Sequence, residues 1–146
     1  MLIIPVADGY DDIVCITPAG DLQVSINNKD GTSTKPPTFR NLGQVKKTEG
    51  WAQDRVRLAD IDGDGRTDYC ILDDGGNVRC WRNGGTKDAP EYWQYLGTRF
   101  TAKGMGDMRG VRFADINGDV SWESLLMTGD MLFPCSTSRT ITYGQK

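Results

Sequence analysis

The chain has 146 residues, enough for one domain with a sizeable core, and it carries a formal net charge of −3. This acidic balance excludes the electrostatic footprint of a nucleic-acid-binding protein. Histidine is absent, which excludes Ser-His-Asp and Cys-His catalysis and the usual zinc sites. No stretch approaches the roughly 20 apolar residues of a membrane span.

The N-terminal segment 2–6 is apolar, but it is too short for the core of a signal peptide and no basic region precedes it. We therefore expect either that the natural N-terminus lies upstream or that the protein is exported by another route. Beyond this segment, 18 glycines and many Asp and Asn residues are typical of a turn-dense all-β protein.

The sequence repeats itself with a period of 54 to 56 residues. The matching pairs of segments are 8–16 with 64–72, 19–22 with 75–78, 26–28 with 82–84, 39–43 with 93–97, and 56–61 with 111–116. We therefore divide the chain into three units, at 1–54, 55–109 and 110–146. The third unit is shorter than the others, so we expect it to be incomplete.

The middle unit contains four short segments rich in β-branched, aromatic and aliphatic residues, which predict four strands. These strands are expected at about 55–60, 68–73, 77–82 and 92–99. Four antiparallel strands in each unit, repeated at this length, predict an all-β fold of β-propeller blades, with about 2.5 to 3 blades in the chain. A β-sandwich and a linear solenoid are the alternatives.

The first two strands of the middle unit are joined by an acidic loop, residues 60–68. Alternating acids on a tight turn bring hard oxygens to one point, which suits a Ca²⁺ ion. An EF-hand would need a ligand at its twelfth position, where Ile71 stands. The expected ligands are the side chains of Asp60, Asp62, Asp64 and Asp68 and the carbonyl of Arg66. The alternative is that Asp and Gly simply form a good turn.

A variant of this loop occupies residues 115–123. Its candidate metal ligands are Asp115, Asn117, Asp119 and Glu123. Val120 stands where the first loop has Gly65, a position at which a positive φ can be required. Glu123 also replaces Asp68. We therefore expect this second loop to be the poorer calcium site.

The sequence at 56–69 resembles the FG-GAP/VCBS repeats of integrin-α-like propellers, and it is most similar to copies in secreted fungal proteins. Some of those proteins also carry an SGNH/GDSL-type esterase domain. In that family the acidic loops coordinate calcium, so the resemblance implies the two ligand sets given above. The first unit departs from the family pattern, because Pro5 and Val6 replace loop residues and only Asp8 and Asp12 remain. We expect no ion there.

Two of the four cysteines flank a predicted turn. A hairpin centred near Gly75 would place Cys70 directly opposite Cys80, at a separation that suits a cross-strand disulfide. Two buried thiols in a reduced protein are the alternative. Together with a calcium loop, a disulfide favours an extracellular location. Cys15 and Cys135 have no partner that the sequence assigns.

The aromatic and basic residues suggest where a ligand could bind. Sugar-binding propellers use exposed aromatic rings as stacking platforms, and Trp51 and Trp122 are the candidates for such ligand contacts. Trp93 aligns with an aromatic residue of the first unit and is expected to pack between blades. Lys46 and Lys47 are expected to mark a solvated loop.

The chain contains no nucleophile elbow, GDSL-like block or phosphate-binding loop, so no catalytic residue is predicted. The expected function is that of a non-catalytic, calcium-binding propeller module that binds a glycan, in a lectin-like manner, or a cell-surface protein. One alternative is a structural accessory, or a truncated module of a larger secreted enzyme, with no ligand of its own. Another is an enzyme whose site is not recognised.

The number of units bears on assembly. The resemblance implies a ring of about six to eight blades, whereas this chain holds at most three. Too few blades would leave strand edges exposed, and a homo-oligomer that completes the ring would cover them. The alternatives are that the chain is a fragment, or that a C-terminal strand at 139–143 seals an edge.

Overall fold

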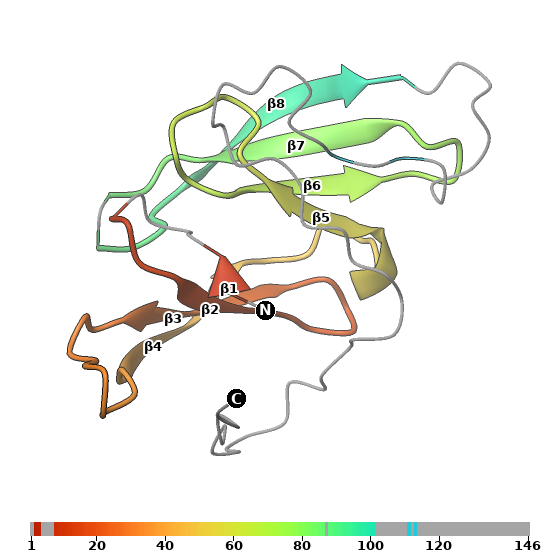
Figure 1. Ribbon diagram of the computed structural model, residues 1–146. Coiled ribbons are helices and arrows are strands. Elements are labelled where there is room, and N and C mark those ends of the chain that lie inside the picture. The colour runs from red at the N-terminus through yellow and green to blue at the C-terminus, as the bar shows by residue number, and fades with distance from the viewer. Residues whose placement is uncertain (1, 4–7, 87, 102–110, 112, 114–146) are drawn as a thin grey trace.

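The computed structural model describes residues 2–3, 8–86, 88–101, 111 and 113, and within them it shows two antiparallel sheets of four strands each (Figure 1). The first sheet contains β1 (Leu2–Ile3), β2 (Asp12–Ile16), β3 (Leu22–Asn27) and β4 (Phe39–Lys46). The second sheet contains β5 (Val56–Ala59), β6 (Asp68–Leu72), β7 (Val78–Asn83) and β8 (Trp93–Phe100). A 3-10 turn, Gln53–Arg55, precedes β5.

Within each sheet the strands pair in chain order, so each sheet is a simple meander. Figure 1 shows the two sheets stacked one above the other. This arrangement confirms the predicted all-β class, and the two sheets are blades of a partial β-propeller. Most of the predicted third unit, 110–146, lies outside the described residues.

The two sheets repeat each other in detail. Strand β6 begins 56 residues after β2, and β7 begins 56 residues after β3. Both outer strands are also bulged at the same place, where Gly43 and Gly97 adopt φ angles of 70° and 79°. Glycine has no Cβ and takes this conformation without strain, so it is the usual residue at such a bulge.

Contact between the sheets forms the larger hydrophobic core. Val14 and Val24 from the first sheet pack with Val56 and Ile71 from the second, and the half-buried Trp93 lies against them. The prediction that Trp93 packs between blades is confirmed. The indole Nε1 of Trp93 also donates a hydrogen bond of 2.9 Å to the carbonyl of Val45, which ties β8 to β4.

The opposite face of the second sheet carries a second core. Cys70, Leu72 and Val78 are buried there, and Val111 and Phe113 from the start of the third unit pack against them. Val56 and Leu58, the counterparts of Val111 and Phe113 in the repeat, contribute in the same way to the core between the sheets. The second and third units therefore each begin with residues that cover one face of the preceding blade, as in propeller packing.

The predicted Cys70–Cys80 disulfide is present in this second core. The two residues are directly opposite in the β6–β7 register, and their sulfur atoms are 2.06 Å apart. Asp73 sets the register, because its carboxylate accepts hydrogen bonds from the backbone N–H groups of Gly75 and Asn77 in the connecting turn. Cys15 is also disulfide-bonded.

One expectation about the basic residues is wrong. Lys46 is the last residue of β4 and is only 7% exposed, rather than solvated. Its ammonium group lies 5.0 Å from the centre of the Tyr69 ring and 5.1 Å from that of Trp81, and it forms an ion pair with Glu49. The cation–π contacts and the ion pair offset the cost of burying the charge. The two aromatic partners, Tyr69 and Trp81, lie far from Lys46 in the sequence, so the pattern around Lys46 did not reveal these contacts.

Candidate metal centre

The acidic loop, residues 60–68, connects β5 to β6 and winds around the carboxylate of Asp60. Oδ1 of Asp60 accepts hydrogen bonds from the backbone N–H groups of Gly63, at 2.8 Å, and Asp64, at 3.2 Å. Oδ2 accepts a third, of 2.7 Å, from Gly65. Gly65 has a φ of 80°, a backbone conformation that glycine adopts without strain, and its counterpart Val120 in the variant loop lies outside the described residues.

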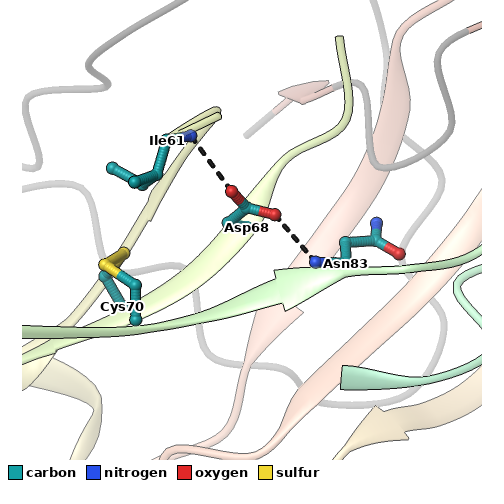
Figure 2. Close-up of a disulfide and its surroundings, with 5 residues drawn as sticks. Ile61, Asp68, Cys70 and Asn83 are labelled. Carbon is teal, nitrogen blue, oxygen red and sulfur yellow. Dashed lines mark hydrogen bonds between the residues drawn. A yellow bond between two sulfur atoms is a disulfide. The ribbon is translucent and has the colours of Figure 1, made fainter. Parts of the chain in front are cut away.

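Asp68 closes the loop at the start of β6, and it is fully buried. Figure 2 shows its carboxylate between two backbone donors: Ile61 donates to Oδ2 over 3.0 Å, and Asn83, at the end of β7, donates to Oδ1 over 2.7 Å. Burial raises the pKa of this carboxyl to about 6, and the neighbouring charges of Asp62 and Asp64 act in the same direction, while the two backbone hydrogen bonds oppose the rise.

Three of the predicted side-chain ligands come together. One oxygen atom from each of Asp60, Asp62 and Asp68 lies within 4.8 Å of the others. Asp60 and Asp68 are buried and Asp62 is exposed. We call these three residues the carboxylate cluster. Hard carboxylate oxygens that converge on one point are the donor set that a calcium ion prefers, so the residues present fit this ion.

Asp64, the fourth predicted acid, does not belong to the cluster. Its Oδ2 accepts hydrogen bonds from Nη2 of Arg66, at 2.5 Å, and from Nη2 of Arg82, at 2.8 Å. Nε of Arg82 also forms an ion pair with Oδ2 of Asp62. The side chain of Arg66 binds Asp64 and the carbonyl of Asn83. That the backbone carbonyl of Arg66 is a ligand of the ion stays a prediction.

Sequence reasoning missed the part that β7 plays at this loop, through Arg82 and Asn83. A signal for Asn83 was present, because the repeat alignment pairs it with Asn27. The two asparagines behave alike: the N–H of Asn27 donates a hydrogen bond of 2.8 Å to Asp12, as that of Asn83 does to Asp68. The alignment gave no such signal for Arg82, whose counterpart is Ile26.

The first unit neutralises one of its two remaining loop acids, Asp8, with a lysine. The ammonium group of Lys29 lies 2.9 Å from Oδ2 of Asp8, which is the counterpart of Asp64. The hydrogen bond to Asp8 raises the pKa of Lys29. Lys29 therefore stays charged beside Asp8 at neutral pH. The variant loop at 115–123 lies outside the described residues, with its candidate ligands Asp115, Asn117, Asp119 and Glu123.

Of the two tryptophans predicted to contact a ligand, the structure describes only Trp51. Trp51 is half-buried against the core between the sheets, and the guanidinium groups of Arg55 and Arg79 lie 5.7 Å and 5.8 Å from its ring centre. It was expected to be exposed and is not. Trp122 lies outside the described residues. Within the described part of the chain, the exposed large apolar and aromatic side chains are Tyr10, Tyr92, Tyr95 and Phe100.

The fold and the site together define a class of protein, namely a β-propeller repeat with an acidic loop between the first two strands of a blade. A family profile described as FG-GAP-like repeat matches residues 7–71 and again 60–121. The chain belongs to this FG-GAP-like repeat family. Neither the curated proteins nor the solved structures gave a significant match.

Two further findings concern membrane-spanning helices and the redox environment. No helix in the described part of the chain is long and apolar enough to cross a membrane. The Cys70–Cys80 disulfide indicates an oxidising environment such as the extracellular space, because thiols in the cytosol are kept reduced.

Proposed function

We propose that this chain is a calcium-binding, non-catalytic propeller module that works outside the cell. The carboxylate cluster of Asp60, Asp62 and Asp68 carries the proposal. Three carboxylates so close together repel one another, and a divalent cation would neutralise them and stabilise the loop. As part of the same proposal, we infer that this chain is related to the VCBS and integrin-α-like propellers of secreted proteins.

Calcium should therefore stabilise the fold. At a calcium concentration about a hundred times the dissociation constant we expect about 2.7 kcal/mol of added stability, and hence a rise in melting temperature of about 5–10 °C over chelator-treated protein. The substitution Asp62→Asn should remove most of this difference, because Asp62 is the exposed member of the cluster and can be changed without opening the core. Thermal unfolding with calcium and with chelator measures both effects.

A control and a contrary result complete this test. Asp74→Asn removes a carboxylate that is 81% exposed in the β6–β7 turn, and it should leave the calcium response intact. A melting temperature that is the same with calcium and with chelator would contradict the calcium proposal. A glycan array probed with both forms of the protein shows whether calcium also supports ligand binding.

The ligand in this proposal is a glycan or a cell-surface protein. Support comes from Tyr92 and Tyr95, which lie just before and within the outer strand β8 and are 57% and 56% exposed. Exposed aromatic rings provide large apolar surfaces on which a sugar face or a protein side chain can pack. If no ligand binds with or without calcium, the alternative of a structural accessory module is favoured.

We also propose that a second or third copy of the chain completes the propeller ring. Support comes from the packing: Val111 and Phe113 cover one face of the second sheet as Val56 and Leu58 cover the first, so each blade needs a neighbour on both faces. Ultracentrifugation at micromolar concentration should therefore give a multiple of the 16.1 kDa chain mass. A compact monomer would contradict this assembly.

A further inference from the structure

Arg82 lies where it can influence the candidate metal centre. It is the second-last residue of β7, and its guanidinium group contacts two acids of the loop at once. Nη2 donates a 2.8 Å hydrogen bond to Asp64, and Nε forms an ion pair with Asp62. The Arg82 side chain is 33% exposed and that of Asp62 is 29% exposed, so both are partly open to solvent, although Nε of Arg82 itself is buried.

The two contacts of Arg82 differ in kind. The contact with Asp64 is a hydrogen-bonded ion pair, and Arg66 supports it by binding the same oxygen atom. The contact with Asp62 is an ion pair alone, since Nε of Arg82 has no hydrogen-bond partner among the described residues. Ion pairs that are also hydrogen-bonded are the stronger ones. The interaction with Asp62 is therefore the easier one to exchange.

Asp62 thus has two competing roles. Its oxygen belongs to the carboxylate cluster with Asp60 and Asp68, and it is also the ion-pair partner of Arg82. An oxygen atom that coordinates a divalent cation cannot keep a guanidinium group in direct contact without bringing two positive groups together. Occupation of the cluster by a cation therefore requires that Arg82 give up Asp62.

Comparison of the two repeats shows that the strand itself does not require an arginine here. The counterpart of Arg82 in the first unit is Ile26, which is buried in β3. In that unit the basic group beside Asp8 comes instead from Lys29, which follows the strand. An aliphatic residue is therefore compatible with this position of a blade, and the arginine is a particular feature of the repeat that carries the carboxylate cluster.

We propose that Arg82 competes with the calcium ion for Asp62 and so lowers the calcium affinity of the acidic loop. This inference rests on the proposed calcium-binding function and extends it to how the site is regulated. Without the ion, Arg82 neutralises Asp62 and Asp64 and keeps the loop folded. With the ion, Arg82 retains Asp64, which Arg66 also holds. The loop is thereby tuned to calcium concentrations higher than its carboxylates alone would require.

The test is calcium titration by calorimetry on the wild type and on Arg82→Gln, at about 0.15 M salt to screen distant charges. We expect Arg82→Gln to bind calcium about tenfold more tightly, a size typical of coupling between two sites. Arg82→Ile, which introduces the residue that the first unit carries, should do the same and provides a second variant should the first fail to fold. Arg79→Gln is the matched control: it removes the same charge from the same strand, at a residue that lies over Trp51.

The outcomes separate this inference from the proposed function. If the wild type binds calcium and both Arg82 variants bind it with unchanged affinity, the competition is refuted while calcium binding stands. If Arg79→Gln tightens binding as much as Arg82→Gln, the effect is one of overall charge, and the specific role of Arg82 is refuted. If neither the wild type nor any variant binds calcium, the proposed function fails and this inference fails with it.

Discussion

Replacing Tyr69 by alanine should lower the free energy of unfolding by about 3–5 kcal/mol, the range for truncating a large buried aromatic side chain. Tyr69 is fully buried between the two sheets. Its ring packs edge-on against Trp81 and Trp93, with centroid distances of 5.9 Å and 6.4 Å. Its hydroxyl donates a 2.9 Å hydrogen bond to the carbonyl of Gly20 in the turn between β2 and β3. The substitution therefore removes both the packing of the ring and the hydrogen bond that joins the two blades.

Tyr69→Phe separates these two contributions. It keeps the ring but leaves the Gly20 carbonyl without this donor, so we expect a loss of about 1 kcal/mol. Burial raises the pKa of the Tyr69 hydroxyl from 10.0 to about 12. Because the folded-state value is the higher one, the stability that this hydroxyl contributes is fully present below pH 10 and is lost as the pH rises through about 12.

Denaturant unfolding, followed by tryptophan fluorescence, measures these losses. Tyr95→Ala is the control, because the ring of Tyr95 also packs against Trp81 but is 56% exposed, and the substitution should cost less than about 1 kcal/mol. If Tyr69→Ala lowers the free energy of unfolding as little as Tyr95→Ala does, the packing of the two sheets does not depend on the contacts of Tyr69. Two separate unfolding transitions in Tyr69→Ala, in place of one, would show that the blades have been uncoupled.

Local patterns in the sequence predicted the strands and the disulfide well. The four expected strands of the middle unit agree with β5 to β8 to within two residues at each end, because strand-favouring composition and turn chemistry act over a few neighbouring residues. The Cys70–Cys80 pair followed from the same logic, since a turn held by Asp73 fixes which residues face each other. Both features depend on short stretches of chain.

The electrostatics of the acidic loop were less predictable, because they depend on β7. Arg82 stands 18 residues after Asp64, and only the return of the chain through β6 and β7 places it beside the loop. The contact of Arg79 with the ring of Trp51 likewise depends on the fold, because Arg79 lies on β7. Spacing of acids along the sequence identified the candidate ligands, whereas Arg82, which contacts two of them, could be found only in three dimensions.

Replacing Asp68 by alanine should have two effects, because Asp68 belongs to the carboxylate cluster and also joins the loop to β7. Two backbone N–H groups, those of Ile61 and Asn83, lose their acceptor. Each unsatisfied buried donor costs about 1–3 kcal/mol, so we expect a loss of about 3 kcal/mol even in chelator-treated protein. The response to calcium should disappear as well, since the cluster loses a buried ligand.

Asp12→Ala in the first unit is the matched control for this prediction. Asp12 is also fully buried, and it accepts the same kind of hydrogen bond, from the N–H of Asn27. Its removal should destabilise the fold by about 1–3 kcal/mol and leave the calcium response unchanged, because Asp12 is not a member of the cluster. Unfolding of both variants with calcium and with chelator measures the difference. If Asp68→Ala keeps the calcium response, Asp68 is not a metal ligand. The buried aspartate at the start of β6 then serves only to join two strands, as Asp12 does in the first unit.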